Sequence, residues 1–180
     1  PPRPGSVDPA ADPAQARERL AALMALDAAL PEATRTRLVE PAGAAIATVV
    51  IWHGFTNAPS QFAAVAEALA ELGYRVLLPR MPYHGLPDVL NRELADLTTT
   101  ALVTNVDAAI DIAAGFGDPV WVVGLSAGAT LAGWAAATRT EVSRLVLAAP
   151  LVAPTGAPMP LVRLLVKFPR IVPRLYWWWD

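Results

Sequence analysis

A single serine stands between two glycines at a point where an apolar run changes character. Ser126 lies in VWVVGLSAGATLAGW, with Gly124 two residues before it and Gly128 two residues after it. With 11 glycines in 180 residues, four serines would match Gly-x-Ser-x-Gly by chance about 0.015 times. The residues before Ser126 are typical of a buried strand and those after it of a helix. A hydroxyl at such a turn projects above the sheet beside the positive end of a helix, which suits a nucleophile. The alternative is a serine in a tight turn with no chemical role.

A second polar stretch, WHGFTN, follows the first long apolar run. Acyl transfer to a serine needs two N–H donors aimed at the developing oxyanion. The amide of Ala127 would supply one donor, and the amide of Phe55 in this loop would supply the other. His53 and Gly54 would support the motif, because a histidine before glycine at a strand end more often braces a loop than acts as a base. The same is expected of His84 in PYHGLPD, which is typical of a turn.

Strand and helix patterns alternate along the chain. The run 45–52 is nearly continuous β-branched and apolar sequence, as in a strand buried on both faces. Asp12 and Gln15 form a capping box for a first helix whose pattern ends at Pro31, and a later helix pattern stops at Gly73. The alternation predicts an α/β fold, with a mostly parallel sheet covered by helices on both faces. We expect strands at 35–40, 45–52, 74–79, 120–125 and 144–149, and helices at 13–30, 61–72, 98–114 and 127–137.

Composition limits the possible functions. Hydrophobic residues make up 54% of the chain and charged residues 17%, which predicts a large buried core in one domain. The net charge of −2 is spread along the chain, so nothing points to a nucleic-acid partner. The absence of cysteine excludes disulfides and thiol chemistry. Two separated histidines and scattered carboxylates have no metal-ligand spacing, and no apolar run reaches the roughly 18 residues of a membrane-spanning helix.

The two ends of the chain differ from the middle. Residues 1–12 are rich in proline and poor in bulky apolar side chains, which predicts a disordered linker or tail. Residues 13–150 hold the strand and helix patterns and form the expected core. Residues 151–180 are rich in proline, aromatic and basic residues and do not form another strand–helix unit.

Three stretches, VIWHGFT, LPRMPYHGLPD and VVGLSAGA, resemble the motifs of the α/β-hydrolase superfamily in their order along the chain. The chain is most similar to bacterial carboxylesterases and monoacylglycerol lipases, although its Tyr-His-Gly turn matches their Gly-His-Gly turn only in part. The similarity covers about residues 35–150. It implies an α/β-hydrolase fold, Ser126 as nucleophile, and the backbone amides of Phe55 and Ala127 as the oxyanion hole. It also implies a small-molecule ester or lipid substrate and no cofactor.

The resemblance further implies that 151–180 begin a cap over the site. The cap would give an apolar wall for an acyl chain or a contact with a membrane surface. A cap helix that simply packs on the domain is an equal alternative. The apolar residues are Leu161, Val162, Leu164, Leu165, Val166, Phe168 and 176–179, interspersed with Arg163, Lys167, Arg170 and Arg174.

In this family an acid and then a histidine follow the serine along the chain. His53 and His84 precede Ser126, and Asp180 comes too early to be the family acid. We therefore expect the 180 residues to be the N-terminal part of a longer hydrolase whose acid and histidine lie in a further stretch of about 80 to 130 residues. Alone they would be a poor catalyst, because a serine without a base is a weak nucleophile. The strand at 144–149 would then form an exposed apolar edge.

Other functions stay open. A peptidase or acyltransferase of the same fold would use the same serine on a different substrate. A non-catalytic binding module with a hydrolase-like pocket would need no base. A Rossmann-type dinucleotide protein is disfavoured, because no Gly-x-Gly-x-x-Gly follows the first long strand. The sequence leaves open the oligomeric state and whether the protein is cytoplasmic, exported or tethered to a membrane.

Overall fold

The computed structural model describes residues 5, 7–87 and 93–151. The chain divides into two compact units, Pro1–Pro150 and Leu151–Asp180. The cap expected from the sequence lies outside the described residues, apart from the first residue of the second unit.

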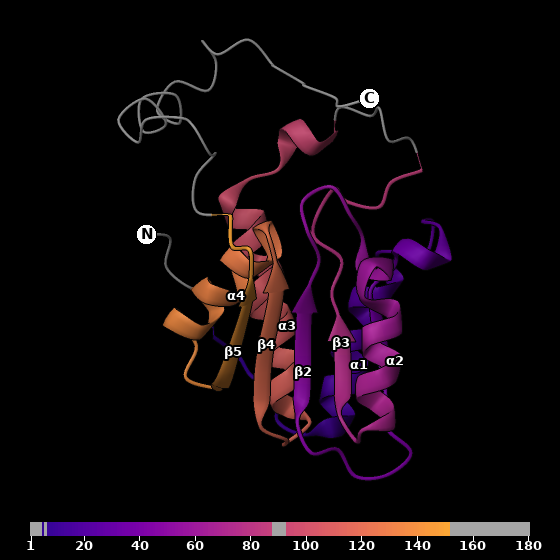
Figure 1. The fold of residues 1–180 in the computed structure, drawn as a ribbon, viewed down its shortest axis with the longest axis vertical. Helices are drawn as coiled ribbons and strands as arrows, with labels where there is room; N and C mark the ends of the chain where they lie inside the picture. Colours follow the sequence, from indigo (N-terminus) through magenta and orange to yellow (C-terminus); the bar gives the residue numbers. More distant parts are fainter. Residues whose placement is uncertain (1–4, 6, 88–92, 152–180) are drawn as a thin grey trace. The chain divides into compact units, whose positions relative to one another are not determined.

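A five-stranded sheet forms the centre of the first unit (Figure 1). The strand order is β1-β3-β2-β4-β5; β3, β2, β4 and β5 are parallel to one another, and β1 is antiparallel to β3. The expected α/β fold with a mostly parallel sheet is therefore confirmed. The strands are β1 (Arg37–Val39), β2 (Thr48–Trp52), β3 (Arg75–Leu78), β4 (Val120–Leu125) and β5 (Val142–Ala148).

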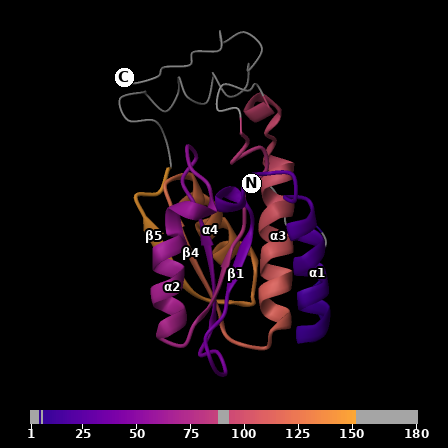
Figure 2. The same ribbon diagram turned by 90° about the vertical axis from the view of Figure 1, so that its right-hand side faces the viewer.

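Helices cover both faces of the sheet. Figure 2 shows α2 on one face, and α1 and α3 on the other. Alternate residues of β2 point to opposite faces, so Val49 and Ile51 pack toward α2 while Val50 and Trp52 pack toward α3. None of the helices within the described ranges has the length and apolarity needed to cross a bilayer. The helices are α1 (Pro13–Ala25), α2 (Ala63–Glu71), α3 (Thr99–Gly115) and α4 (Ala127–Thr138), with short 3-10 turns η1 (Glu32–Thr34), η2 (Pro59–Phe62) and η3 (Glu93–Asp96).

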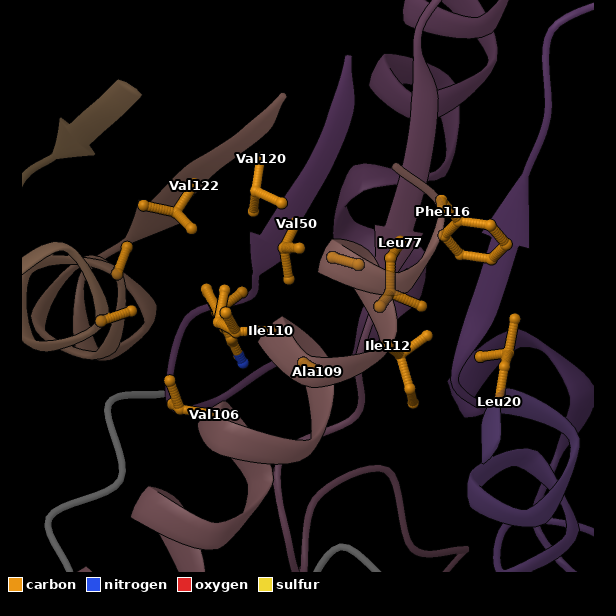
Figure 3. Close-up of a cluster of buried hydrophobic side chains, with 14 of the residues drawn as sticks. Leu20, Val50, Leu77, Val106, Ala109, Ile110, Ile112, Phe116, Val120 and Val122 are labelled. Carbon is orange, nitrogen blue, oxygen red and sulfur yellow. The ribbon is translucent and has the colours of Figure 1, made fainter. Parts of the chain in front are cut away.

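The larger core cluster joins α3 to the sheet. In Figure 3, Val50 and Leu77 of the sheet lie with Ala109 and Ile110 of α3, and Leu20 of α1 lies beyond them. Each of these side chains is at most 5% exposed. Their burial stabilises the packing of α1 and α3 on the sheet. The candidate site lies in the loops at the carboxyl ends of β2, β3 and β4.

The first helix is shorter than its sequence pattern predicts. It ends at Ala25, and Leu26 is 77% exposed. Asp27 is buried and accepts hydrogen bonds from the Thr36 amide at 2.8 Å and from Arg80 Nε at 2.7 Å. The expectation that the helix continues to residue 30 is wrong. Asp27, the polar residue of the apolar repeat, turns inward and binds the Thr36 amide and Arg80, which is distant in sequence.

The described part of the N-terminal segment differs from the disordered tail expected from its composition. Ala10 is 6% exposed, and its amide donates to the Asp111 carbonyl at 3.0 Å. Gly115 lies so close beneath that a Cβ there would overlap the Ala10 methyl group. Small residues on both sides therefore let Ala10 pack against α3.

The expected capping box forms in part at the start of α1. The Asp12 carboxylate accepts from the Gln15 amide at 2.9 Å. The Gln15 side-chain oxygen reaches back to the Ala11 amide at 2.8 Å, one residue before the cap. Both bonds satisfy amides near a helix terminus that lack intrahelical partners.

Candidate active site

Ser126 sits where β4 passes into α4. Its φ is 56° and its ψ −116°, a conformation that costs a residue other than glycine about 1–3 kcal/mol. Its amide donates to the Ala148 carbonyl at 2.9 Å, and its carbonyl accepts from the Thr130 amide at 3.2 Å. The residue is half-buried and lies at the carboxyl end of the sheet.

The two glycines that flank Ser126 lie at backbone contacts that leave no room for a side chain. A Cβ on Gly124 would overlap the Gly128 carbonyl, and a Cβ on Gly128 would overlap the carbonyl oxygens of Trp52 and His53. The first turn of α4 therefore rests directly on the ends of β4 and β2. This contact brings Ser126 next to the loop that follows β2.

His53 braces that loop from within. It is fully buried, its Nδ1 lies 2.8 Å from the Gly54 carbonyl, and its Nε2 lies 3.2 Å from the Met81 amide. Since Nε2 must accept from an amide, we assign the proton to Nδ1. Burial lowers the pKa of His53 from 6.5 to about 4. The ring is therefore neutral at pH 7 and has no nitrogen left to receive a proton from Ser126.

His84 packs beneath the same loop. Its ring makes edge contacts with His53 at 5.3 Å and with Phe55 at 5.2 Å between centroids. Its Nδ1 lies 2.8 Å from the Pro82 carbonyl, while Nε2 has no hydrogen-bond partner among the described residues. Burial lowers the pKa of His84. In the same turn, Tyr83 has a φ of 63°, in the left-handed region that glycine favours.

A polar network behind the histidines was missed by the sequence analysis. Arg80 binds Asp27 on one side and donates to the His84 carbonyl at 3.0 Å on the other. Asn105 of α3 donates to the Arg80 carbonyl at 3.0 Å and accepts from Trp52 Nε1 at 3.4 Å. Two features of the sequence could have indicated this network: Asp27 on the apolar face of a predicted helix, and Arg80 directly after a predicted strand.

The structure places Ser126, Phe55 and Ala127 together at the carboxyl end of the sheet. In the register of β2 and β4, Trp52 lies beside Gly124, so the loop and the helix start on adjacent strands. Neither the Phe55 amide nor the Ala127 amide has an acceptor among the described residues. Ala127 is the first residue of α4, where an amide has no intrahelical partner and negative charge is favoured.

The described part of the chain supplies neither a base bonded to Ser126 nor a metal site. No histidine or carboxylate there is hydrogen-bonded to Ser126. No group of three or more potential ligands within the described residues could hold a metal ion.

Comparison with protein families identifies the fold family. A family model described as serine aminopeptidase, S33, matches residues 43–178, which is more than half of the chain. The chain belongs to this α/β-hydrolase family. The α/β-hydrolase resemblance of its sequence motifs is thereby confirmed.

Solved structures of other proteins show the same fold. The chain is 25% identical, with a TM-score of 0.58, to a structure from work on LipS and LipT, two metagenome-derived lipolytic enzymes; the match covers 72% of this chain and 55% of that one. It is 20% identical, with a TM-score of 0.59, to the monoacylglycerol lipase of Paleococcus ferrophilus, over 78% of this chain and 52% of that one. The chain thus spans about half the length of these structures. A comparison with curated proteins found no match.

Proposed function

We propose that the protein is a serine hydrolase that cleaves carboxylic esters through an acyl-enzyme on Ser126. The observation that carries the proposal is the backbone of Ser126, held at φ 56° between two glycines at the start of α4. In the reaction, Ser126 Oγ attacks the ester carbonyl carbon and gives its proton to a general base. The alcohol leaves with a proton, and water then hydrolyses the acyl-serine.

The amides of Phe55 and Ala127 are proposed to bind the oxyanion. Both follow adjacent strands, and both lack a protein acceptor among the described residues. Loss of one such donor typically costs about 100- to 1,000-fold in kcat. The reaction as proposed needs no cofactor.

The proposal requires a histidine and an acid other than the described residues. His53 has both ring nitrogens engaged, and His84 makes its contacts beneath the loop rather than with the serine. Residues 1–180 alone are therefore expected to turn over esters poorly, because the serine hydroxyl would stay protonated.

An ester or lipid is the proposed substrate. The lipolytic character of the relative that is 25% identical supports this choice. The apolar and basic residues of 151–180 fit an acyl-binding cap or a membrane-surface contact.

Labelling with a fluorophosphonate probe tests the nucleophile. The protein should label, and Ser126→Ala should abolish labelling. Ser143→Ala is the matched control, because Ser143 Oγ donates to the Val120 carbonyl at 2.9 Å away from the proposed site. Labelling that survives Ser126→Ala would remove the basis for an acyl-enzyme at this residue.

A peptidase of the same fold is the second candidate. The description of the family, serine aminopeptidase, favours it. Turnover of p-nitrophenyl esters compared with aminoacyl amides separates the two enzymes. A protein that neither labels nor turns over either substrate would instead fit a non-catalytic binding module.

A further inference from the structure

We infer that Gln61 is a positioning residue for the oxyanion hole and that it acts by fixing the peptide planes on either side of Gly54. The inference rests on the proposed function of Ser126 and goes beyond it. Gln61 lies in η2, the turn after the HGFT loop, and its amide donates to the Ala58 carbonyl at 3.0 Å. Its side-chain oxygen Oε1 accepts from the Gly54 amide at 2.8 Å.

Gly54 is the flexible point of this loop. Glycine has more backbone freedom than any other residue, so its flanking peptides need external partners to stay in one orientation. The Gly54 carbonyl has two such partners, the Asn57 amide at 3.0 Å and His53 Nδ1 at 2.8 Å. The Gly54 amide has Gln61 as its hydrogen-bond partner.

These bonds determine where the Phe55 amide points. The peptide that joins Gly54 to Phe55 is planar and trans, so its N–H points away from the Gly54 carbonyl. Because that carbonyl is turned inward to His53 and Asn57, the Phe55 N–H is turned the opposite way. Gln61 fixes the preceding peptide, whose His53 carbonyl lies against Gly128 at the start of α4.

Loss of the Gln61 bond would free the peptide between His53 and Gly54, and rotation about Gly54 would then weaken the hold of His53 and Asn57 on the Gly54 carbonyl. The Phe55 amide would then sample directions in which it cannot meet an oxyanion. Ground-state binding of the ester would change little, since the amide acts on charge that develops only in the transition state.

Gln61→Met keeps the length of the side chain and removes the amide acceptor. Gln15→Met is the matched control, because Gln15 is the only other glutamine, and its Oε1 also accepts a backbone amide at 2.8 Å, at the start of α1. Both variants lose the same kind of bond. Gln61→Asn, which is too short to reach the Gly54 amide, provides a second variant should the methionine variant fold poorly.

The experiment first establishes ester turnover by the full-length protein and its loss in Ser126→Ala; failure at this step concerns the proposed function alone. Gln61→Met and Gln61→Asn should then lower kcat by about 10- to 100-fold, with KM changed by less than about threefold. Gln15→Met should leave kcat within about twofold of the unaltered protein. A kcat near that of the unaltered protein in both Gln61 variants, or an equal loss in Gln15→Met, would overturn the inference.

Discussion

The backbone of Ser126 occupies a conformation that glycine adopts freely and that other residues avoid. Its φ of 56° and ψ of −116° place strain at the residue proposed as nucleophile. Ser126→Gly should relieve this strain, whereas Ser126→Ala should retain it. We expect the free energy of unfolding in urea to be about 1–2 kcal/mol higher for the glycine variant than for the alanine variant. Equal values for the two variants would show that the turn stores no strain at this position.

The buried ring of His53 makes stability depend on pH. Its pKa falls from 6.5 to about 4 because burial disfavours the charged imidazolium. The unfolded chain therefore binds a proton more readily, so the contribution of His53 to stability is complete above about pH 6.5 and declines toward pH 4. The full loss amounts to about 3 kcal/mol.

Chemical unfolding between pH 7 and pH 4 measures this contribution. The slope of the unfolding free energy against pH should be shallower in His53→Gln than in the unaltered protein. His84→Gln is the companion variant, because burial lowers the pKa of His84 as well. An unchanged slope in His53→Gln would contradict the assignment of a buried neutral ring.

At the scale of elements, the contact between α4 and β2 depends on a glycine. A Cβ at Gly128 would overlap the carbonyl oxygens of Trp52 and His53. Gly128→Ala should therefore cost about 3 kcal/mol or more, because overpacking here meets backbone rather than a movable side chain. Gly54→Ala is the control, since its Cβ would lie 3.6 Å from the Gln61 side chain and its φ is not positive. Thermal unfolding of both variants gives the comparison; equal losses would refute the proposed close approach.

A buried ion cluster joins α3 to the end of α4. The Arg139 side chain is 0% exposed and binds Asp107 at 3.0 Å, Glu141 at 2.8 Å and also Asp111. Arg139→Met should cost about 3–5 kcal/mol, because it leaves carboxylates buried without their cation. Arg17→Met should cost less than about 1 kcal/mol, since the Arg17 side chain is 53% exposed in its pair with Glu40. Urea unfolding that gave similar losses for both variants would show that the cluster contributes no more than a surface pair.

Local patterns predicted the elements well because each one is set by neighbouring residues. The apolar run before Ser126 formed a strand and the Asp12 side chain capped α1, both as expected. The end of α1 was wrong because the partner of Asp27, Arg80, lies 53 residues away. The antiparallel pairing of β1 with β3 was likewise invisible, since a strand pattern carries no information on the direction of its neighbour.

At the scale of the whole molecule, the family could be predicted from three short motifs and their order. The positions of Ser126, Phe55 and Ala127 followed from the same motifs, and their catalytic roles stay predictions. The interactions that hold the site could not be predicted. In the sequence, nothing distinguishes Gln61 from other polar residues; only the fold brings its oxygen to the Gly54 amide. Likewise, the two hydrogen-bond partners of His53 depend on how two loops meet.

Among the described residues, the sheet ends on an exposed strand. β5 is at one edge of the strand order, and Leu145, Val146 and Leu147 are 41%, 56% and 43% exposed. Unpaired backbone groups beside apolar side chains form a template on which a second copy can add a strand. We therefore expect residues 1–180 to self-associate with rising concentration.

Val146→Lys should reduce this association, because a charge on an edge strand opposes strand addition. Val65→Lys is the matched control: Val65 is 46% exposed on α2, where no strand edge is present, so the same substitution should have little effect. Light scattering after size-exclusion chromatography across a concentration series measures the outcome. A monomer at all concentrations, or an equal response of the two lysine variants, would show that association does not proceed through β5.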